Sequence, residues 1–430
     1  SDAKRTGIRV QFGGDADAPP TQGLIVTGRT GRVDALDWIG VFAGEGTGGS
    51  LPLRRIDVNA SQLRLLGADF PDTRLLLVPA TTGTAVQVQG ARIAGSLLVP
   101  KRDGAQIAGR FDRLYWRSPA KTSTGTKTAT SAPASSQPSF DPAGIPPLLF
   151  EVADLRIGEV VLGKARFRST PVATTGMRLD EFSARSPKQR VNASGSWFGR
   201  NDAARTQLKL EVDSDDIGVL LAGLGLPGQV DGGKGRLGAQ ANWRGGPEAF
   251  DPKSIEAAIS LDARDGRLLE LEPGAGRVLG LLGIAQLPRR LTLDFRDFFE
   301  KGFAFDHITG DVRLAQGTAR TDNLTIQGPA ADIHVRGSAD LRTQRFDQTV
   351  EVLPKSGGLL TAVGALAGGP VGAAIGAVAN AVLEKPLQGV GAKTYRVTGP
   401  WASPVVEVST RNAPPKPVVP VKPVKAEPAG

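Results

Sequence analysis

The residue types that carry most enzyme and metal chemistry are scarce in this sequence. It has two histidines, His307 and His334, and no cysteine. A nucleophile with its base, or a set of metal ligands, needs such residues beside partners at fixed spacings. Neither histidine has partners at those spacings, and His334 stands on the polar side of an alternating segment, where a structural histidine is the simpler interpretation. The sequence therefore predicts no catalytic centre, no metal site and no cofactor.

Glycine-rich segments match phosphate-binding patterns only in part. Residues 223–228 (GLGLPG) fit GxGxxG, and residues 228–234 (GQVDGGK) begin like a P-loop. The first pattern ends an expected helix, and Gly235 takes the place of the Ser or Thr that would bind Mg²⁺. Asp215 and Asp216 begin that helix, where capping explains adjacent acids better than acid–base catalysis. Turn glycines and a helix cap are the favoured interpretation.

Charge and composition also limit the class of partner. The formal net charge is +9, but it is spread along the chain, and aromatic residues make up 5% of the sequence. Nucleic-acid binding would need a basic stripe interleaved with aromatic residues, so nucleic acid is excluded as a partner. A modest positive balance suits anionic headgroups, although an ordinary solvated face is the simpler explanation.

Strict alternation of apolar and polar residues is the main structural pattern. Apolar residues recur at every second position in several segments between 291 and 352, and polar or charged residues stand between them. This period is typical of strands that bury one face. We therefore predict a groove lined by the apolar members of these strands, namely Leu291, Leu293, Phe295, Val312, Leu314, Ile333, Val335, Val350 and Val352.

The predicted fold is mainly β: an elongated, curved antiparallel sheet that forms an open apolar groove. The 55 glycines and few aromatic residues fit a thin sheet with many turns better than a large aromatic core. Short helices are expected at 33–42, 215–224 and 274–285.

An uncharged run at 359–383 predicts a C-terminal helical hairpin over 359–384. Its apolar part is long enough to span a membrane, but Gly368, Gly369 and Pro370 divide it into two arms that are each too short. The hairpin could cap the end of the sheet or contact a membrane, and both interpretations stay open. The predicted membrane-contacting residues are Leu359, Leu360, Val363, Leu366, Val371, Ile375, Val378 and Val382.

Composition divides the chain into four parts. Residues 1–118 form one β-groove segment, and residues 119–144 form a low-complexity Ser/Thr/Ala/Pro linker or loop. Residues 145–412 form the second groove segment, which includes the hairpin. Residues 413–430 are a Pro- and Lys-rich tail that is expected to be disordered.

Several segments of the sequence resemble, in the same order, segments of the C-terminal part of the YhdP family of AsmA-like envelope proteins of Gram-negative bacteria. They are DPAGIPPLLFEVADLRIGEVVLG at 141–163, DSDDIGVLLAGLGLPGQVDGGKGRLGAQANWRG at 213–245, and the alternating block that follows. The resemblance covers roughly residues 1–410. It implies a periplasmic β-groove through which phospholipids pass towards the outer membrane. It also implies an inner-membrane anchor formed by an N-terminal helix that this chain lacks.

Two functions follow from these observations. The first is bridge-like, non-enzymatic transport of phospholipids between inner and outer membrane, which supports outer-membrane integrity. Its partners would be phospholipid acyl chains and a membrane surface, the outer membrane, at the C-terminal end. The alternative is a periplasmic structural or assembly scaffold of the cell envelope that conducts no lipid and docks a protein partner by strand addition at a sheet edge or at the tail.

Overall fold

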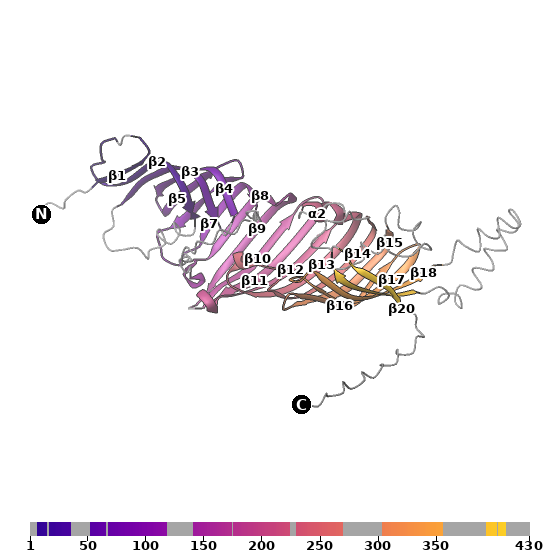
Figure 1. Cartoon of the computed structure of the whole chain (residues 1–430). Coiled ribbons are helices and arrows are strands. Elements are labelled where there is room, and N and C mark those ends of the chain that lie inside the picture. Colours follow the sequence, from indigo (N-terminus) through magenta and orange to yellow (C-terminus); the bar gives the residue numbers. More distant parts are fainter. Residues whose placement is uncertain are drawn as a thin grey trace, which may run out of the picture.

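The computed structural model describes residues 7–14, 17–35, 52–65, 68–117, 141–173, 175–223, 229–269, 303–355, 393–401 and 403–409. These residues form one elongated sheet of twenty strands (Figure 1). Each strand pairs with its neighbours in sequence, so β1 (Gly7–Phe12) and β20 (Val405–Ser409) are the two edges. The prediction of a mainly β, elongated and curved sheet is confirmed.

The strands of the first half are β2 (Gly23–Asp34), β3 (Leu53–Leu65), β4 (Ala68–Ala80), β5 (Gly83–Gln89), β6 (Ile93–Pro100), β7 (Ile107–Trp116), β8 (Leu148–Ile157), β9 (Val160–Val172) and β10 (Gly176–Arg185). Those of the second half are β11 (Gln189–Phe198), β12 (Arg205–Ser214), β13 (Val230–Arg244), β14 (Glu256–Leu268), β15 (Phe303–Ala315), β16 (Thr318–Gln327), β17 (Ala331–Asp340), β18 (Arg345–Pro354) and β19 (Lys393–Pro400).

The sheet departs from the expected antiparallel pattern at three places. Strands β1 and β2, β2 and β3, and β7 and β8 pair in parallel. Parallel neighbours need a connection that returns across the sheet, and here the chain uses residues 13–22, 35–52 and 117–147. The expected linker at 119–144 is such a return, because β7 and β8 on either side of it are hydrogen-bonded to each other. Its residues 119–140 lie outside the described residues.

One face of the sheet is apolar and the other is charged. In β18, for example, Phe346, Val350 and Val352 are buried, whereas Arg345 and Asp347, on either side of Phe346, are exposed. We call the apolar side the inner face and the charged side the outer face. The alternation follows from the period of two in a strand.

Arginine and aspartate side chains pair on the outer face. Asp57 accepts hydrogen bonds from Arg74 at 2.7 and 2.8 Å and from Arg55 at 2.6 Å. The hydrogen bond from Arg74 is the main reason that the pKa of Asp57 falls from 3.8 to about 2, and burial opposes that shift.

The described helices are short. They are α2 (Ile217–Gly223) and the 3₁₀ turns η1 (Pro142–Gly144), η2 (Asn201–Ala203) and η3 (Pro247–Ala249). No helix in the described ranges is both long and apolar enough to cross a membrane. The helix expected at 215–224 is confirmed by α2.

The helix expected at 33–42 does not begin where predicted. Strand β2 continues through Asp34, because the β-branched side chain of Val33 is buried on the inner face and residues 32–34 pair with β3. Several other predicted features lie outside the described residues: the helix at 274–285, the hairpin at 359–384 and the tail at 413–430.

The strand directions give the sheet two different rims. All connections longer than about a dozen residues (35–52, 117–147, 215–229, 269–302 and 355–392) leave from the rim where β2, β7, β12, β14 and β18 end. We call this the long-loop rim. Connections from the opposite rim, the short-turn rim, are shorter, from two residues at 81–82 and 316–317 to eleven at 245–255.

Candidate functional site

An apolar cavity of about 380 Å³ opens on the inner face across strands β2 to β11. Its lining includes Leu63, Leu75, Leu97, Trp116, Phe150 and Phe182. Arg166 is the one charged residue among its lining residues. Arg166 is exposed and alternates with the inner-facing Ala165 and Phe167, so its charge belongs to the outer face. The cavity therefore presents hydrocarbon and no fixed charge.

The strand register shows that this cavity lies along a longer row of apolar residues. Cross-strand partners follow one another without interruption from β3 to β15, and every one of them is apolar or glycine. We call this the apolar row; it consists of Ile56, Leu77, Val86, Leu97, Gly109, Phe150, Phe167, Phe182, Ala193, Leu210, Ala239, Ile259 and Val312. Polar side chains are absent from this line across thirteen described strands.

Side-chain packing on the inner face forms three clusters that meet at shared residues. Phe111 and Leu114 pack against both the first cluster, in β2–β6, and the second, in β8–β11. On β12, Leu210 packs against the second cluster and Leu208, two residues earlier on the same face, packs against the third, which extends to β19. The apolar surface is thus continuous along the sheet.

The structure brings together the predicted groove residues that it describes. Val312 belongs to the apolar row, and Leu314 is buried in the third cluster. The other four face each other in pairs across β17 and β18, with Ile333 opposite Val352 and Val335 opposite Val350. All four are at most 1% exposed, so they are packed side chains and do not line the cavity. Leu291, Leu293 and Phe295 lie outside the described residues.

Sequence reasoning missed the residues that do line the cavity. They come from β2 to β11, well before the predicted block. The same alternation marks them, for example Leu75 and Leu77 in β4 and Leu97 and Val99 in β6. That pattern could have identified them as inner-facing, but it does not show which inner-facing residues leave space unfilled.

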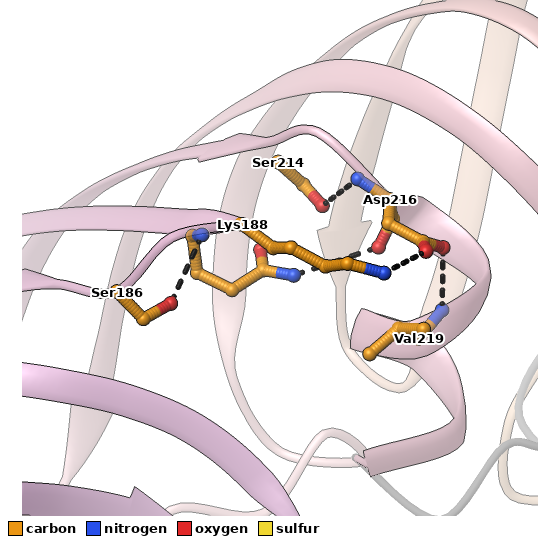
Figure 2. Close-up of polar contacts among 6 residues, drawn as sticks. Ser186, Lys188, Ser214, Asp216 and Val219 are labelled. Carbon is orange, nitrogen blue, oxygen red and sulfur yellow. Dashed lines mark hydrogen bonds and ion pairs between the residues drawn. The ribbon is translucent and has the colours of Figure 1, made fainter.

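Polar contacts fix α2 at the long-loop rim (Figure 2). Asp216 accepts a hydrogen bond from the backbone N–H of Val219 at 3.0 Å, so the second of the two adjacent acids caps the helix. Lys188, in the turn between β10 and β11, donates to the same carboxylate at 2.7 Å. Ser214 accepts from the Asp216 N–H at 3.1 Å. The hydrogen bond from Lys188 is the main cause that lowers the pKa of Asp216.

Helix α2 links two of the inner-face clusters. Ile217 packs against the third cluster and Leu220 against the second. The approach is close, because a Cβ on Gly218 would lie 2.6 Å from the carbonyl oxygen of Val230, and one on Gly223 would lie 2.8 Å from the backbone nitrogen of Val160. The helix therefore runs along the rim from β13 to β9. Its apolar side chains extend the inner face at that rim.

A positive charge stands beside the cavity at the same rim. Arg92 lies over the Phe70 ring at 5.9 Å and donates to the backbone oxygens of Asp69 and Tyr115, both at 3.2 Å. Burial, followed by the charge of Arg117, lowers the pKa of Arg92. Trp116, which lines the cavity, meets Phe70 edge to face at 6.2 Å. Charge and hydrocarbon surface are thus adjacent at this rim.

The residues considered for chemistry play structural roles. His307 Nε2 contacts Asp262 at 3.2 Å, and His334 Nδ1 contacts the Thr325 hydroxyl at 3.2 Å. Lys234 of the partial P-loop lies in strand β13. No group of three or more His, Asp or Glu residues in the described ranges has a geometry suited to a metal ion.

Comparison with known proteins agrees with this geometry. The chain is 26% identical over 408 residues to the intermembrane phospholipid transporter YhdP of Escherichia coli (strain K12). The match covers 92% of this chain and 30% of that relative. No solved structure matches the chain. The family model for the YhdP protein matches residues 1–406, and the chain therefore belongs to the YhdP family.

Proposed function

We propose that the inner face carries the acyl chains of phospholipids between the inner and outer membranes. The observation that supports this most directly is the apolar row from Ile56 to Val312, together with the cavity along its first half. A lipid tail moving along this row would meet no charged or polar side chain. The cavity volume of about 380 Å³ lies within the range of about 300–1,000 Å³ that small-molecule sites occupy.

Solvation energies explain why an apolar row is sufficient for such a function. Each methylene group taken out of water contributes about 0.8 kcal/mol, so a chain of roughly 16 carbons would cost about 12 kcal/mol to expose. An inner face that keeps the chain covered removes most of this barrier. Such passage requires no bond to be made or broken, so we propose a transport protein and not an enzyme.

The polar part of the lipid would stay at the rim in this proposal. Arg92 supplies a positive charge next to the apolar Trp116, an arrangement that suits a molecule with an anionic head and apolar tails. Because the relative is named an intermembrane phospholipid transporter, we propose the periplasm as the place of action. An inner-membrane anchor is part of the same proposal.

Site-specific photo-crosslinking tests which face holds lipid. Leu97 lines the cavity, whereas the neighbouring Ser96 is exposed on the outer face. A photo-reactive residue at 97 should capture phospholipid from vesicles, and the same residue at 96 should not. Equal labelling at both positions would rule out a one-sided lipid path.

A charge placed in the cavity tests transport itself. Leu97→Glu puts a carboxylate among apolar side chains, where it either loses several kcal/mol of hydration or keeps water in the path. We expect at least a tenfold loss of lipid transfer between donor and acceptor vesicles. Ser96→Glu adds the same charge to the outer face and should transfer normally. A folded Leu97→Glu protein that transfers at the normal rate would contradict the proposal.

The segment 359–384 is proposed as the membrane-contacting part, on its sequence alone. The eight apolar positions named above include Ile375 and Val378, which share one side of a helical stripe. Changing both to Asp should reduce flotation of the protein with liposomes. If the two changes instead unfold the neighbouring strands and have no effect on flotation of their own, the capping interpretation is favoured.

The scaffold alternative is supported by one structural observation. Edge strand β1 exposes Ile8, Val10 and Phe12 by 36–39%, all on one side, and its free backbone edge could accept a further strand. A scaffold of this kind would tolerate a charge in the cavity, so the Leu97→Glu transfer assay also separates the two functions.

A further inference from the structure

A second hollow, of about 660 Å³, lies on the outer face across strands β7 to β11. Its lining includes the short outward side chains of Ala153, Ser183 and Asn192. Longer basic side chains stand around them. This hollow is on the side of the sheet opposite to the lipid path proposed above, so it is a separate site.

The lining of the hollow has an excess of positive charge. Five of its residues are basic (Arg110, Lys164, Arg166, Arg185 and Arg190), and two are acidic (Asp112 and Glu151). Arg110 is paired with Glu151 at 3.1 Å. The remaining basic side chains outnumber the one acid left, which favours an anion in the hollow.

Strand register places three of these positive charges side by side. Lys164 of β9 is directly opposite Arg185 of β10, and Arg185 is directly opposite Arg190 of β11. Like charges directly opposite each other destabilise a sheet. Arg190 is 3.7 Å from Asp213, but that carboxylate binds Arg236 more closely, at 2.9 Å. Among the described residues, no carboxylate lies within 4.0 Å of the Lys164 or Arg185 charged groups.

We propose that this hollow binds a phosphate group, carried either by a soluble molecule or by a lipid headgroup. Lys164, Arg185 and Arg190 would hold the phosphate oxygens, because guanidinium forks and an ammonium group match such oxygens well. Adjacent strands place the backbones of these three residues about 5 Å apart, so their side chains can reach one compact, multiply charged anion. An extended acidic peptide would present carboxylates on one side only about every 7 Å, so it fits this spacing less well.

Calorimetry of the whole chain with inorganic phosphate and pyrophosphate tests the site. The variant Lys164→Gln/Arg185→Gln should bind at least tenfold more weakly. The matched control Arg178→Gln/Arg264→Gln removes two other exposed, ion-paired outer-face arginines and should bind normally. The variant without ligand should also melt slightly higher than the unaltered protein, since its like-charge contacts are gone. Added phosphate should raise the melting temperature of the unaltered protein only.

Vesicles distinguish the two sources of phosphate. Stronger flotation with phosphatidic acid vesicles than with phosphatidylcholine vesicles, with the excess lost in the double variant, would identify a headgroup. Binding of free phosphate alone would identify a soluble ligand. Absence of all phosphate binding, equal affinity in the double variant, or binding of a hexaglutamate peptide in place of phosphate would overturn the proposal. None of these results depends on lipid transfer, so the transport proposal is tested separately.

Discussion

At the scale of single residues, the inner face contains two kinds of apolar position. Val335 and Val350 are 0% exposed and are cross-strand partners, so their side chains are fully packed. Leu97 is only half-buried and lines the cavity, and its partner Gly109 lets the two strands approach closely, because a Cβ there would lie 2.7 Å from the Cβ of Leu97. Packed positions therefore contribute to stability, and positions like Leu97 leave room for a ligand.

Charge substitution should separate these two kinds of position. Val335→Asp/Val350→Asp buries two unpaired carboxylates and should lower the free energy of unfolding by several kcal/mol, measured in urea. His334→Asp, at the neighbouring outer-face position, should cost less than about 1 kcal/mol. Similar losses for both variants would contradict the packed inner core at β17 and β18.

Asp57 should give the stability a specific dependence on pH. Its pKa is about 2 in the folded chain against 3.8 ordinarily, so the unfolded chain binds the proton more readily. The contribution is therefore complete above about pH 4 and is lost as the pH falls towards 2. Because both arginine partners are about half exposed, we expect roughly 1 kcal/mol.

Denaturant titrations of Asp57→Asn at several pH values would measure this contribution. The variant should be less stable than the unaltered protein at pH 7 and equally stable near pH 2. The control Asp322→Asn removes a carboxylate that is 69% exposed and should change little at either pH. A difference for Asp57→Asn that stays constant with pH would contradict the assigned ion pair.

At the scale of elements, α2 is the only described helix of more than three residues, and it is held by its cap and by close backbone contact. Asp216 fixes its first turn, and Gly218 allows it to approach Val230. Because Ile217 and Leu220 join two apolar clusters, displacement of α2 would expose both clusters at the rim.

Two substitutions test this role of α2. Asp216→Ala removes the cap and should cost about 1 kcal/mol. Gly218→Val should cost more, because its Cβ would overlap the carbonyl oxygen of Val230. Proteolysis near residues 217–223 should rise in both variants, while the neutral control Val219→Ala, at a 51% exposed position, should behave normally. Unchanged proteolysis of Gly218→Val would show that α2 is not packed against β13.

Sequence pattern predicted the elements well and the site only in part. Alternation identifies a strand and its inner face, and Ile333, Val335 and Val352 do lie on one buried face; their role in a lipid groove stays a prediction. The cavity depends on how side chains of neighbouring strands pack together, for example Leu97 of β6 and Phe150 of β8, and this packing requires the register. The outer-face hollow has the same origin, since Lys164 and Arg185 are distant in sequence and become neighbours only through pairing.

At the scale of the whole molecule, the sheet is long, narrow and unequal at its two rims. Twenty strands at about 4.8 Å spacing extend about 90 Å along the sheet. Every long connection leaves from the long-loop rim, so the short-turn rim has a nearly constant outline. Insertions and labels should therefore be tolerated best at the long-loop rim, where the chain already accommodates them.

The strand order predicts unfolding in parts. Each strand contacts its sequence neighbours, so distant parts of the sheet stabilise each other only through the strands between them. Hydrogen exchange should be fastest in the edge strands β1 and β20 and slowest in β15 to β18, where the third cluster is most buried. Uniform exchange along the sheet, with a single global opening, would contradict this prediction.

The same strand order has a consequence for how the chain acquires its structure during synthesis. Because each new strand pairs with one that has already emerged, the sheet can grow from its N-terminal edge without waiting for distant segments. At every stage the newest strand is an unpaired edge, and the following strand in the sequence is the one that covers it. Folding that keeps pace with chain emergence would limit the time for which each apolar edge is open to aggregation.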